Sequence, residues 1–464
     1  MTNLLRHRLT VCAFSCLASW GSPAIGAAQP TAAYRAWART HAHTISAGDS
    51  AKGTADLRAL DPIVGDARVV AIAEPFHMGH EPLAVRNRII RYLVAKRGFT
   101  AVALETGLTQ SKTLYDYVLG RTPDADSVIR AGFTYGFGAL GENVALLKWL
   151  RAFNASHPAS RQVHLYGIDL PGQMTSDNAA AFARVLDYLD RADPALGARM
   201  RAEYATIVPR FTGRRFVTLP EGERDLVTGK VHDLTTLLRR KRIAFTRATS
   251  PDEYEWALRQ AVNLEQDAAF NRLVPSDFFP WLDKFQGGDP TPYRPEPGIL
   301  AASTVRELSM AENVAWALGR EGSRGRLVSF AHDAHQQMVP HESVAGDPLA
   351  PLLNGLERAG NFARATLGKE LVTIGTYFGA FAGEMPGPIG KRPDGAGAEA
   401  LFGSLDRPAY VADLRAIPAT GELHDFLSRK HETRLDLGMH RLAPMAAYDA
   451  ILYIDRITPA NFPK

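Results

Sequence analysis

Residues 69–107 read VVAIAEPFHMGHEPLAVRNRIIRYLVAKRGFTAVALETG, two apolar runs joined by a helical pattern. The first run ends at Glu74 and the second ends at Glu105. Between them, apolar residues recur at helical spacing until Gly98, a residue type that is favoured just after a helix. The stretch therefore predicts a strand, a helix and a second strand, with an ionisable group at the end of each strand.

Apolar runs of strand length recur along the chain and alternate with helical patterns in its first part. This alternation favours an α/β fold in which a largely parallel sheet is flanked by helices. From about residue 175 to 275 the chain is rich in Arg, Glu, Leu and Ala and has no strong strand pattern, so we expect a helical insertion or subdomain there. The expected strands are Arg68 to Glu74, Thr100 to Glu105, Gln162 to Asp169, Arg326 to Ala331, Leu371 to Tyr377 and Ala450 to Asp455.

The first 28 residues have the pattern of a secretory signal peptide. Arg6 and Arg8 give a positive start, Leu9 to Trp20 form a short apolar run, and small residues stand at positions 26–28. The apolar run is too short to cross a bilayer as a stable helix, so we expect no stable membrane span. The sequence predicts an exported protein, periplasmic or secreted after the signal peptide is removed.

Removal of the signal peptide would leave residues 29–464 as the mature domain. Cys12 and Cys16, the two cysteines of the chain, both lie in the removed segment, which excludes a cysteine nucleophile and a disulfide in the mature chain. The 53 basic residues less Arg6 and Arg8 leave 51 against 49 acidic ones. This balance gives no reason to expect nucleic acid or an anionic membrane as a partner.

Polar residues stand at the carboxyl ends of four expected strands. In open α/β sheets ligands bind beyond these strand ends, so groups that are distant in sequence can meet in one cleft. Glu74 and Glu105 each end an apolar run, which favours a site role, whereas Asp169 fits helix capping or loop hydrogen bonding equally well. The strand-end residues are Glu74, His77, Glu105, Asp169, His332, Asp333 and His335.

Arg86 lies in the helix that is expected after the first strand. It precedes Ile90 and Leu93 by four and seven residues, so it lies on the apolar face of that helix. An unpaired buried cation is very costly, although a long side chain can also reach water past its stem. Glu74 and Glu105 are the expected partners of Arg86.

The run from Glu74 to Glu105 resembles the erythromycin esterase family. That family carries a Glu-x-x-His motif after its first strand, an Arg on the following helix and a Glu that closes the next strand. In this sequence Glu74, His77, Arg86 and Glu105 match these positions in order and spacing. Ala73 stands where the family usually has Gly before the Glu, and Met78 stands where Gly commonly follows the His.

The resemblance continues through most of the mature chain. VHLYGID resembles the third strand of the family, and Arg306–Asn313 resembles the helix before the next strand. FAHDAH resembles the His-Asn-x-His segment, with His332 and His335 on the two histidines and Asp333 in place of the Asn. An acidic Asp333 is expected to raise the basicity of a neighbouring imidazole.

The resemblance implies a hydrolase of a carboxylic ester or a macrolide-like lactone, and so a link to macrolide antibiotic resistance. It implies no cofactor and no metal, and a small molecule as the partner. A neutral imidazole accepts protons near neutral pH, so His77 is expected to activate water as the general base, with Glu74 orienting its ring. Because no Gly-x-Ser-x-Gly elbow is present in the sequence, direct attack by water is favoured over a serine acyl-enzyme.

The remaining groups at the strand ends receive supporting roles. Glu105 is expected to pair with Arg86, and Arg86, His332 and His335 to supply positive charge or donors to the oxyanion. Asp169 and Asp333 are expected to bind substrate. The other histidines, apart from His80 at the start of the helix, are expected on the surface or in satisfied packing positions: His41, His43, His157, His164, His232, His341, His424, His431 and His440.

Two alternatives use the same cleft. A metal-dependent hydrolase would bind its ion with His77, Glu74, Glu105, His332 and His335, which offer nitrogen and oxygen ligands. A non-catalytic exported binding protein would instead use the cleft for recognition of a small molecule, with Arg86 holding an anionic group. A nucleotide-binding enzyme is disfavoured because no Walker-type loop or Gly-x-Gly-x-x-Gly follows the first expected strand. The sequence predicts no particular oligomeric state.

Overall fold

The three-dimensional structure is a computed structural model. The predicted signal peptide, residues 1–28, lies outside the described residues. The structure describes residues 29–48, 53–170, 178–211, 213–289, 291–294, 297–344, 347, 349–383, 390, 392–393, 395, 397–435 and 438–462.

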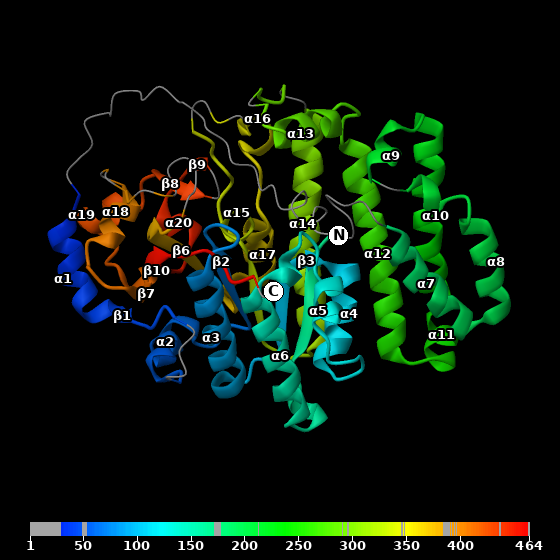
Figure 1. Ribbon diagram of the computed structural model, residues 1–464, viewed down its shortest axis with the longest axis horizontal. Helices are drawn as coiled ribbons and strands as arrows, with labels where there is room; N and C mark the ends of the chain where they lie inside the picture. The colour runs from blue at the N-terminus through cyan, green and yellow to red at the C-terminus, as the bar shows by residue number, and fades with distance from the viewer. Residues whose placement is uncertain are drawn as a thin grey trace.

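An eight-stranded sheet forms the centre of the described part of the chain (Figure 1). Its order is β1-β7-β10-β6-β2-β5-β3-β4, and the run from β10 to β4 is parallel throughout. The six strands of that run are the six that the sequence predicts, so the predicted α/β fold is confirmed. The strands are β1 (Ala42–Thr44), β2 (Val69–Glu74), β3 (Ala101–Gly107), β4 (His164–Asp169), β5 (Leu327–His332), β6 (Leu371–Phe381), β7 (Ala409–Asp413), β8 (His431–Leu435), β9 (Gly438–Leu442) and β10 (Ala450–Ile457).

The strands at one edge were not predicted. Strand β7 pairs antiparallel with β10, and the three-residue β1 pairs antiparallel with β7. Strands β8 and β9 form a separate antiparallel pair. These strands are short, so each offers little alternation to read in the sequence.

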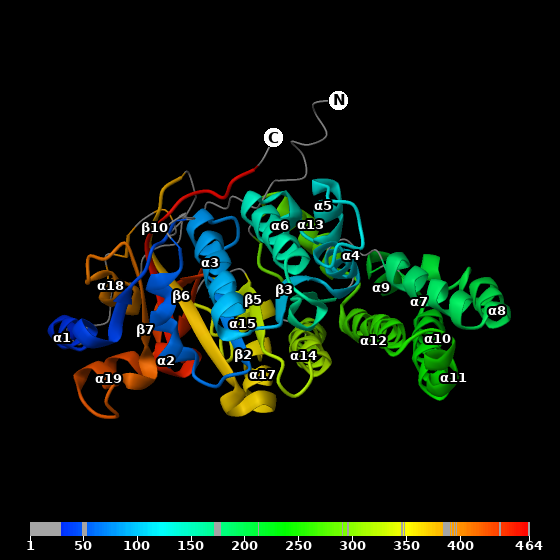
Figure 2. The ribbon, with the colours of Figure 1, turned by 90° about the horizontal axis from the view of Figure 1, so that it is seen from below.

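Helices cover both faces of the sheet (Figure 2). The helices are α1 (Thr31–His41), α2 (Leu60–Val64), α3 (His80–Arg97), α4 (Leu108–Val118), α5 (Asp126–Gly132), α6 (Gly141–Ala155), α7 (Ala179–Ala192), α8 (Pro194–Tyr204), α9 (Gly213–Thr218), α10 (Glu221–Arg240), α11 (Arg242–Ala248), α12 (Pro251–Leu273), α13 (Phe278–Gln286), α14 (Pro297–Arg320), α15 (Asp333–Gln336), α16 (Ala350–Leu353), α17 (Ala359–Leu367), α18 (Ala398–Gly403), α19 (Glu422–Leu427) and α20 (Pro444–Ala447).

The alternation of side chains in β2 explains the two covered faces. Val70 and Ile72 join the core cluster that contains Ile90 of α3, whereas Val69 joins the cluster that contains Val314 of α14. Successive strand residues point to opposite faces, so a strand that is apolar at every position must be covered on both sides. Helices α3 and α6 accordingly lie over one face, and α14 and α17 lie over the other (Figure 2).

The predicted helical segment consists of α7 to α12, which project from one side of the sheet (Figure 1). The described residues between 178 and 275 contain no strand. These helices bury a core of their own, which includes Phe182, Leu189, Tyr204, Leu234 and Leu264. The helical part of the predicted fold is therefore confirmed.

The strand order changes direction beside β2. From β2 the chain passes through α3 to β3 on one side, whereas from β5, which lies between β2 and β3, it crosses to β6 on the other side. A crevice forms at the carboxyl ends of strands where connections diverge in this way. Glu74 of β2 lies directly opposite His332 of β5 in the strand register, so the predicted site residues stand at this crevice.

Helix α3 fixes the position of Arg86. The helix ends at Gly98, whose φ of 68° is left-handed and whose N–H donates to Leu93, as the sequence predicts. Arg88, two residues further along the same helix, is also buried and donates to Asp56 across 2.7 Å. Membrane crossing would need a longer apolar helix than any that the described residues contain.

Candidate active site

His77 and Glu74 form a hydrogen-bonded pair just after β2. Nδ1 of His77 lies 2.8 Å from Oε2 of Glu74, while the His77 side chain is 27% exposed and the Glu74 side chain 5%. Burial raises the pKa of Glu74, and His77 and Arg86 act in the opposite direction. The chain reaches this arrangement through Met78, whose φ of 70° is a conformation that favours glycine.

Glu105 is the carboxylate on which the site converges. Its Oε2 accepts the backbone N–H of His332 at 2.7 Å, and its Oε1 lies 3.4 Å from Nε2 of His335. The same Oε1 lies 4.0 Å from Nε2 of His77 and 3.7 Å from Nη2 of Arg306. Burial opposes ionisation, but His335, His77 and Arg306 hold the pKa of Glu105 well below its usual range.

His335 bridges two buried carboxylates. Its Nδ1 lies 2.8 and 2.9 Å from the two oxygens of Glu307, and its Nε2 faces Glu105. Burial alone would lower the pKa of His335, but Glu307 and Glu105 raise it to about 9. His335 therefore carries a positive charge at neutral pH.

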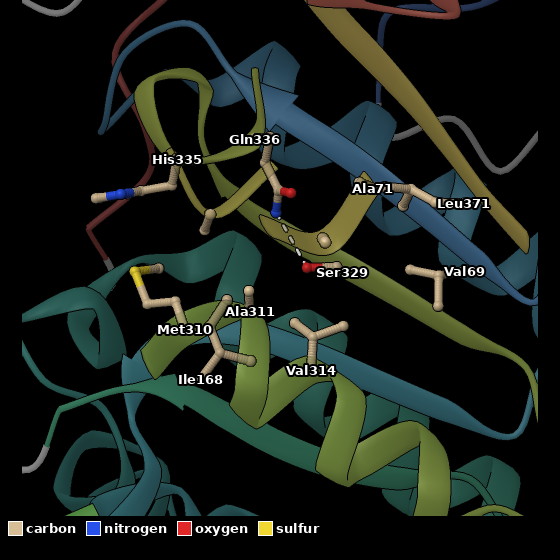
Figure 3. Close-up of a pocket in the computed structure, with 12 residues that line it drawn as sticks. Val69, Ala71, Ile168, Met310, Ala311, Val314, Ser329, His335, Gln336 and Leu371 are labelled. Carbon is tan, nitrogen blue, oxygen red and sulfur yellow. Dashed lines mark hydrogen bonds between the residues drawn. The ribbon is translucent and has the colours of Figure 1, made fainter. Parts of the chain in front are cut away.

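Helix α15 is anchored over an apolar pocket between the sheet and α14 (Figure 3). Val69 and Met310 are among the side chains that line this pocket. Gln336 turns toward the sheet and donates to Oγ of Ser329 at 3.0 Å, whereas the ring of His335 points in another direction (Figure 3). The anchored turn holds His335 in place for its carboxylate partners.

Arg86 lies on the α3 side of the crevice, in the wall of a second pocket, but it does not pair with Glu105. Its Nη2 donates to Oδ1 of Asn87 and Oδ1 of Asn143, both at 2.8 Å, and its guanidinium lies 4.5 Å from the centre of the Phe330 ring. Burial lowers the pKa of Arg86 to about 10, and nearby Glu74 partly opposes this. Two neutral amides thus bind the guanidinium of Arg86, for which the sequence predicts carboxylate partners.

Arg306 and Glu307, both on α14, are site residues that the sequence reasoning missed. Arg306 donates to both oxygens of Asp169, at 3.0 and 2.7 Å, and Tyr135 donates to the same carboxylate at 2.6 Å. Arg306 precedes Met310, an apolar residue that α14 buries, by four residues. The spacing by which Arg86 precedes Ile90 therefore also predicts that Arg306 lies on a buried face.

Asp169 and Asp333, which the sequence assigns to substrate binding, are both buried. Asp169 is fully buried and directs Arg306 toward Glu105. Asp333 accepts a hydrogen bond from Tyr448 at 2.6 Å, and burial raises its pKa to about 7. The carboxylates that raise the pKa of His335 are Glu307 and Glu105, and the expected effect of Asp333 on a neighbouring imidazole stays a prediction.

The structure thus brings the predicted residues together at one crevice. The rings of His77 and His332 lie 4.8 Å apart, and His332 caps α15 by accepting the Ala334 N–H. A pocket at this position has a charged end and an apolar wall. It is lined by Glu74, His77, Met78, Leu83, Arg86, Leu104, Glu105, Phe133, Phe137, Leu140, Asn143 and Phe330.

The positions of the expected ligands bear on the alternative of a metal-dependent hydrolase. In the part of the chain that the structure describes, no group of three or more His, Cys, Asp or Glu side chains is arranged to hold a metal ion. His335, one of the proposed ligands, directs both ring nitrogens to carboxylates and is protonated at neutral pH. A metal ligand must instead be a neutral imidazole.

The charged pair of His335 and Glu307 predicts how stability depends on pH. The pKa of His335 is raised to about 9, so its contribution is complete below its unfolded value of about 6.5 and is lost as the pH rises through 9. Glu307 has a pKa lowered to about 2 by His335 and Arg358 against the effect of burial, so its contribution is lost as the pH falls from about 4 through 2.

We therefore expect the free energy of unfolding to fall by about 3 kcal/mol between pH 6 and pH 10 through this pair. Urea denaturation of the wild-type protein and of His335→Gln at both pH values measures this contribution. The decrease should be smaller in the variant by that amount. Equal decreases in the two proteins would show that His335 is not held charged.

Known proteins resemble this chain in sequence. A protein-family model described as erythromycin esterase matches residues 94–457. This range includes Glu105, His332 and His335 but begins after His77 and Arg86. Over 293 residues the chain is 25% identical to erythromycin esterase type II of Escherichia coli, which covers 61% of this chain and 64% of that protein. The match spans just under two thirds of that relative.

Solved structures share the fold. A crystal structure of a Bacillus cereus protein has a TM-score of 0.76 and 22% identity, covering 94% of this chain and 99% of that chain. An erythromycin esterase mutant in its open conformation has a TM-score of 0.63 and 16% identity, covering 88% of this chain and 95% of that chain. At these identities the likeness shows the fold alone.

Proposed function

The chain belongs to the erythromycin esterase family, and from that premise we propose that it hydrolyses a carboxylic ester or a macrolide-like lactone with water activated by His77. Family membership supports a hydrolase of this family. The observation that carries the finer proposal is the His77–Glu74 pair, which faces the cluster of Glu105, His335 and Arg306 across one crevice.

His77 acts as the general base. The hydrogen bond to Glu74 orients the ring and favours the tautomer with the proton on Nδ1, so that Nε2 accepts the proton from water. Glu105, 4.0 Å from Nε2, stabilises the imidazolium that forms. These are the roles that carboxylate and imidazole play in other hydrolytic sites.

Cations with fixed positions stabilise the negative charge that develops on the carbonyl oxygen. Arg86 in the pocket wall, and His335 and Arg306 beside Glu105, are each held in place by fixed hydrogen-bond partners. Cations that are already oriented do not have to reorganise as the oxyanion forms. His332 lies beside His77 and adds a donor at the same edge, and Asp169 acts on the substrate through Arg306.

The pocket wall fits a substrate with an apolar body. Phe133, Phe137, Leu140 and Phe330 line it opposite the charged groups. A concave apolar wall with a few convergent polar groups is typical of small-molecule sites. Export to the periplasm or beyond is part of this proposal and is supported by the composition of residues 1–28.

A substrate screen tests the proposal and its rivals. The purified protein is incubated with macrolides, lactones and simple esters, and the products are weighed by mass spectrometry. We expect a product heavier than its substrate by one water for a lactone, and the acid and alcohol for an ester, with activity retained after chelation. Loss of activity on chelation with recovery on adding metal would favour the metal-dependent alternative, and tight binding without turnover would favour the binding protein.

A further inference from the structure

Three buried cationic or imidazole side chains lie beside the active site and take no part in the proposed reaction. They are Arg358, 2% exposed, His341, 4% exposed, and His440, 1% exposed. His341 and His440 have ring centres 5.3 Å apart. Both rings lie close enough to Arg358 and His332 for these groups to lower their pKa values, although burial is the larger cause. The three side chains are called the Arg358 cluster below.

The Arg358 cluster has buried nitrogens without hydrogen-bond partners among the described residues. These are Nε and Nη2 of Arg358 and both ring nitrogens of His341 and of His440. The prediction that these two histidines occupy satisfied packing positions is therefore wrong. Buried polar atoms are rarely left unsatisfied, because each such atom forfeits its hydrogen bonds with water.

Arg358 shares its carboxylate partner with His335. Its Nη1 lies 3.3 Å from Oε1 of Glu307, which also contacts His335, while Glu105 contacts the other ring nitrogen of His335. The unused edge of Arg358, formed by Nε and Nη2, has the fork geometry that binds two oxygens of one oxyanion.

The histidines restrict the kind of oxyanion. Burial and Arg358 lower the pKa of His341 to about 3, and the pKa of His440 is also well below its usual range, so both rings are neutral. A neutral imidazole has one N–H donor and one nitrogen that accepts. A ligand that satisfies the cluster must therefore accept from Arg358 and donate to a ring nitrogen.

We propose that Arg358, His341 and His440 form a buried binding site for a phosphate group. A phosphate that retains a proton has oxygens for the guanidinium and an O–H donor for an imidazole. The proposed phosphate site adjoins the active site, because Glu307 contacts both Arg358 and His335. The phosphate belongs either to free inorganic phosphate or to a substrate that carries a phosphate ester.

Calorimetric titration with inorganic phosphate tests the site without any need for activity. The titration is made at pH 6.5 and constant ionic strength, with sulfate as the comparison anion. We expect phosphate to bind more tightly than sulfate, which has no hydroxyl at this pH. Arg358→Lys, which keeps the charge but loses the fork, should weaken phosphate binding by about 10- to 100-fold.

His440→Phe supplies a second variant, which retains an aromatic ring at this position but removes both ring nitrogens. In phosphate-free buffer it should be at least as stable as the wild-type protein, because it removes unsatisfied buried polar atoms, and it should bind phosphate more weakly. Arg441→Gln is the matched control, since Arg441 is the next residue in β9 but is 45% exposed and paired with Glu432. Arg441→Gln should bind phosphate as the wild-type protein does.

A second measurement separates the two sources of the phosphate and rests on the proposed esterase activity. The KM of a carboxylic ester that carries a phosphate group is compared with that of the same ester without it. A KM raised in Arg358→Lys only for the phosphate-bearing ester assigns the group to the substrate, whereas an unchanged KM for both esters, together with weakened phosphate binding, assigns the site to free phosphate.

Absence of phosphate binding to the wild-type protein in the titration would overturn the proposal, as would unchanged binding in Arg358→Lys. Equal binding of sulfate and phosphate would overturn the role of the two histidines. Because the titration does not depend on hydrolysis, failure to find an ester substrate would leave this test intact.

Discussion

His77→Asn is expected to lower turnover by about 10²- to 10⁴-fold, the usual contribution of a positioned general base. The amide of Asn cannot accept a proton from water, whereas the His77 ring, oriented by Glu74 at 2.8 Å, can do so. The His77 side chain is 27% exposed at the crevice, so its replacement by a smaller polar group leaves no closed cavity. The fold and the thermal midpoint should stay nearly unchanged.

The measurement is steady-state hydrolysis of the best ester found in the screen, with His164→Asn as the matched control. His164 also bonds to a buried carboxylate, Glu321 at 2.9 Å, and its side chain is 30% exposed. However, His164 is the first residue of β4, so it lies at the amino ends of the parallel strands, away from the crevice at their carboxyl ends. His164→Asn should keep full turnover. Near-normal turnover in a folded His77→Asn protein would remove His77 from the mechanism.

The pH profile of the wild-type enzyme should agree with this role. Only a neutral imidazole accepts a proton, so turnover should fall as the pH is lowered. His335 keeps its charge until the pH approaches 9, and its contribution to the oxyanion is therefore constant over the same range.

Glu307→Gln is expected to cost about 3–5 kcal/mol of unfolding free energy, the typical result of removing one partner of a buried ion pair. Glu307 is 2% exposed and contacts His335 at 2.8 Å, Arg358 at 3.3 Å and the Ala359 N–H at 2.9 Å. Its replacement leaves Arg358 without its carboxylate partner and His335 with Glu105 alone. Turnover should also fall, because His335 loses one of the two carboxylates that hold its ring in position.

Urea denaturation at neutral pH measures this loss, with Glu312→Gln as the control. Glu312 lies on the same helix but is exposed and bonds to Gln266 at 2.8 Å. A surface substitution of this kind should change stability by no more than about 0.5 kcal/mol. Similar small losses in both variants would show that the carboxylate of Glu307 does not hold the active site together.

The parallel part of the sheet was predictable because its strands are apolar on both faces. Runs such as residues 69–74 and 450–455 are too short and too apolar to be surface helices, and the alternation with helices indicates the layers. The edge strands β1 and β7 were not predictable, because each is short and its partner lies far away in the sequence.

The site was predictable where a polar residue ends an apolar strand, as Glu74 and Glu105 do. It was less predictable on helices, where Arg306 and Glu307 lie inside α14 and no strand end marks them. Pairing was the least predictable feature. Arg86 contacts Asn87 and Asn143 rather than Glu105, a choice that only the packing of α3 against α6 decides.

The central claim, that His77 activates a water molecule for attack on an acyl carbon, is tested most directly by a single turnover in water enriched in oxygen-18. Enzyme in excess over an ester substrate is mixed with it in labelled water, and the masses of the acid and the alcohol are measured by mass spectrometry after one turnover. Direct attack predicts one labelled oxygen in the carboxylic acid and none in the alcohol. An unlabelled acid together with label in the alcohol or in the enzyme would contradict the mechanism.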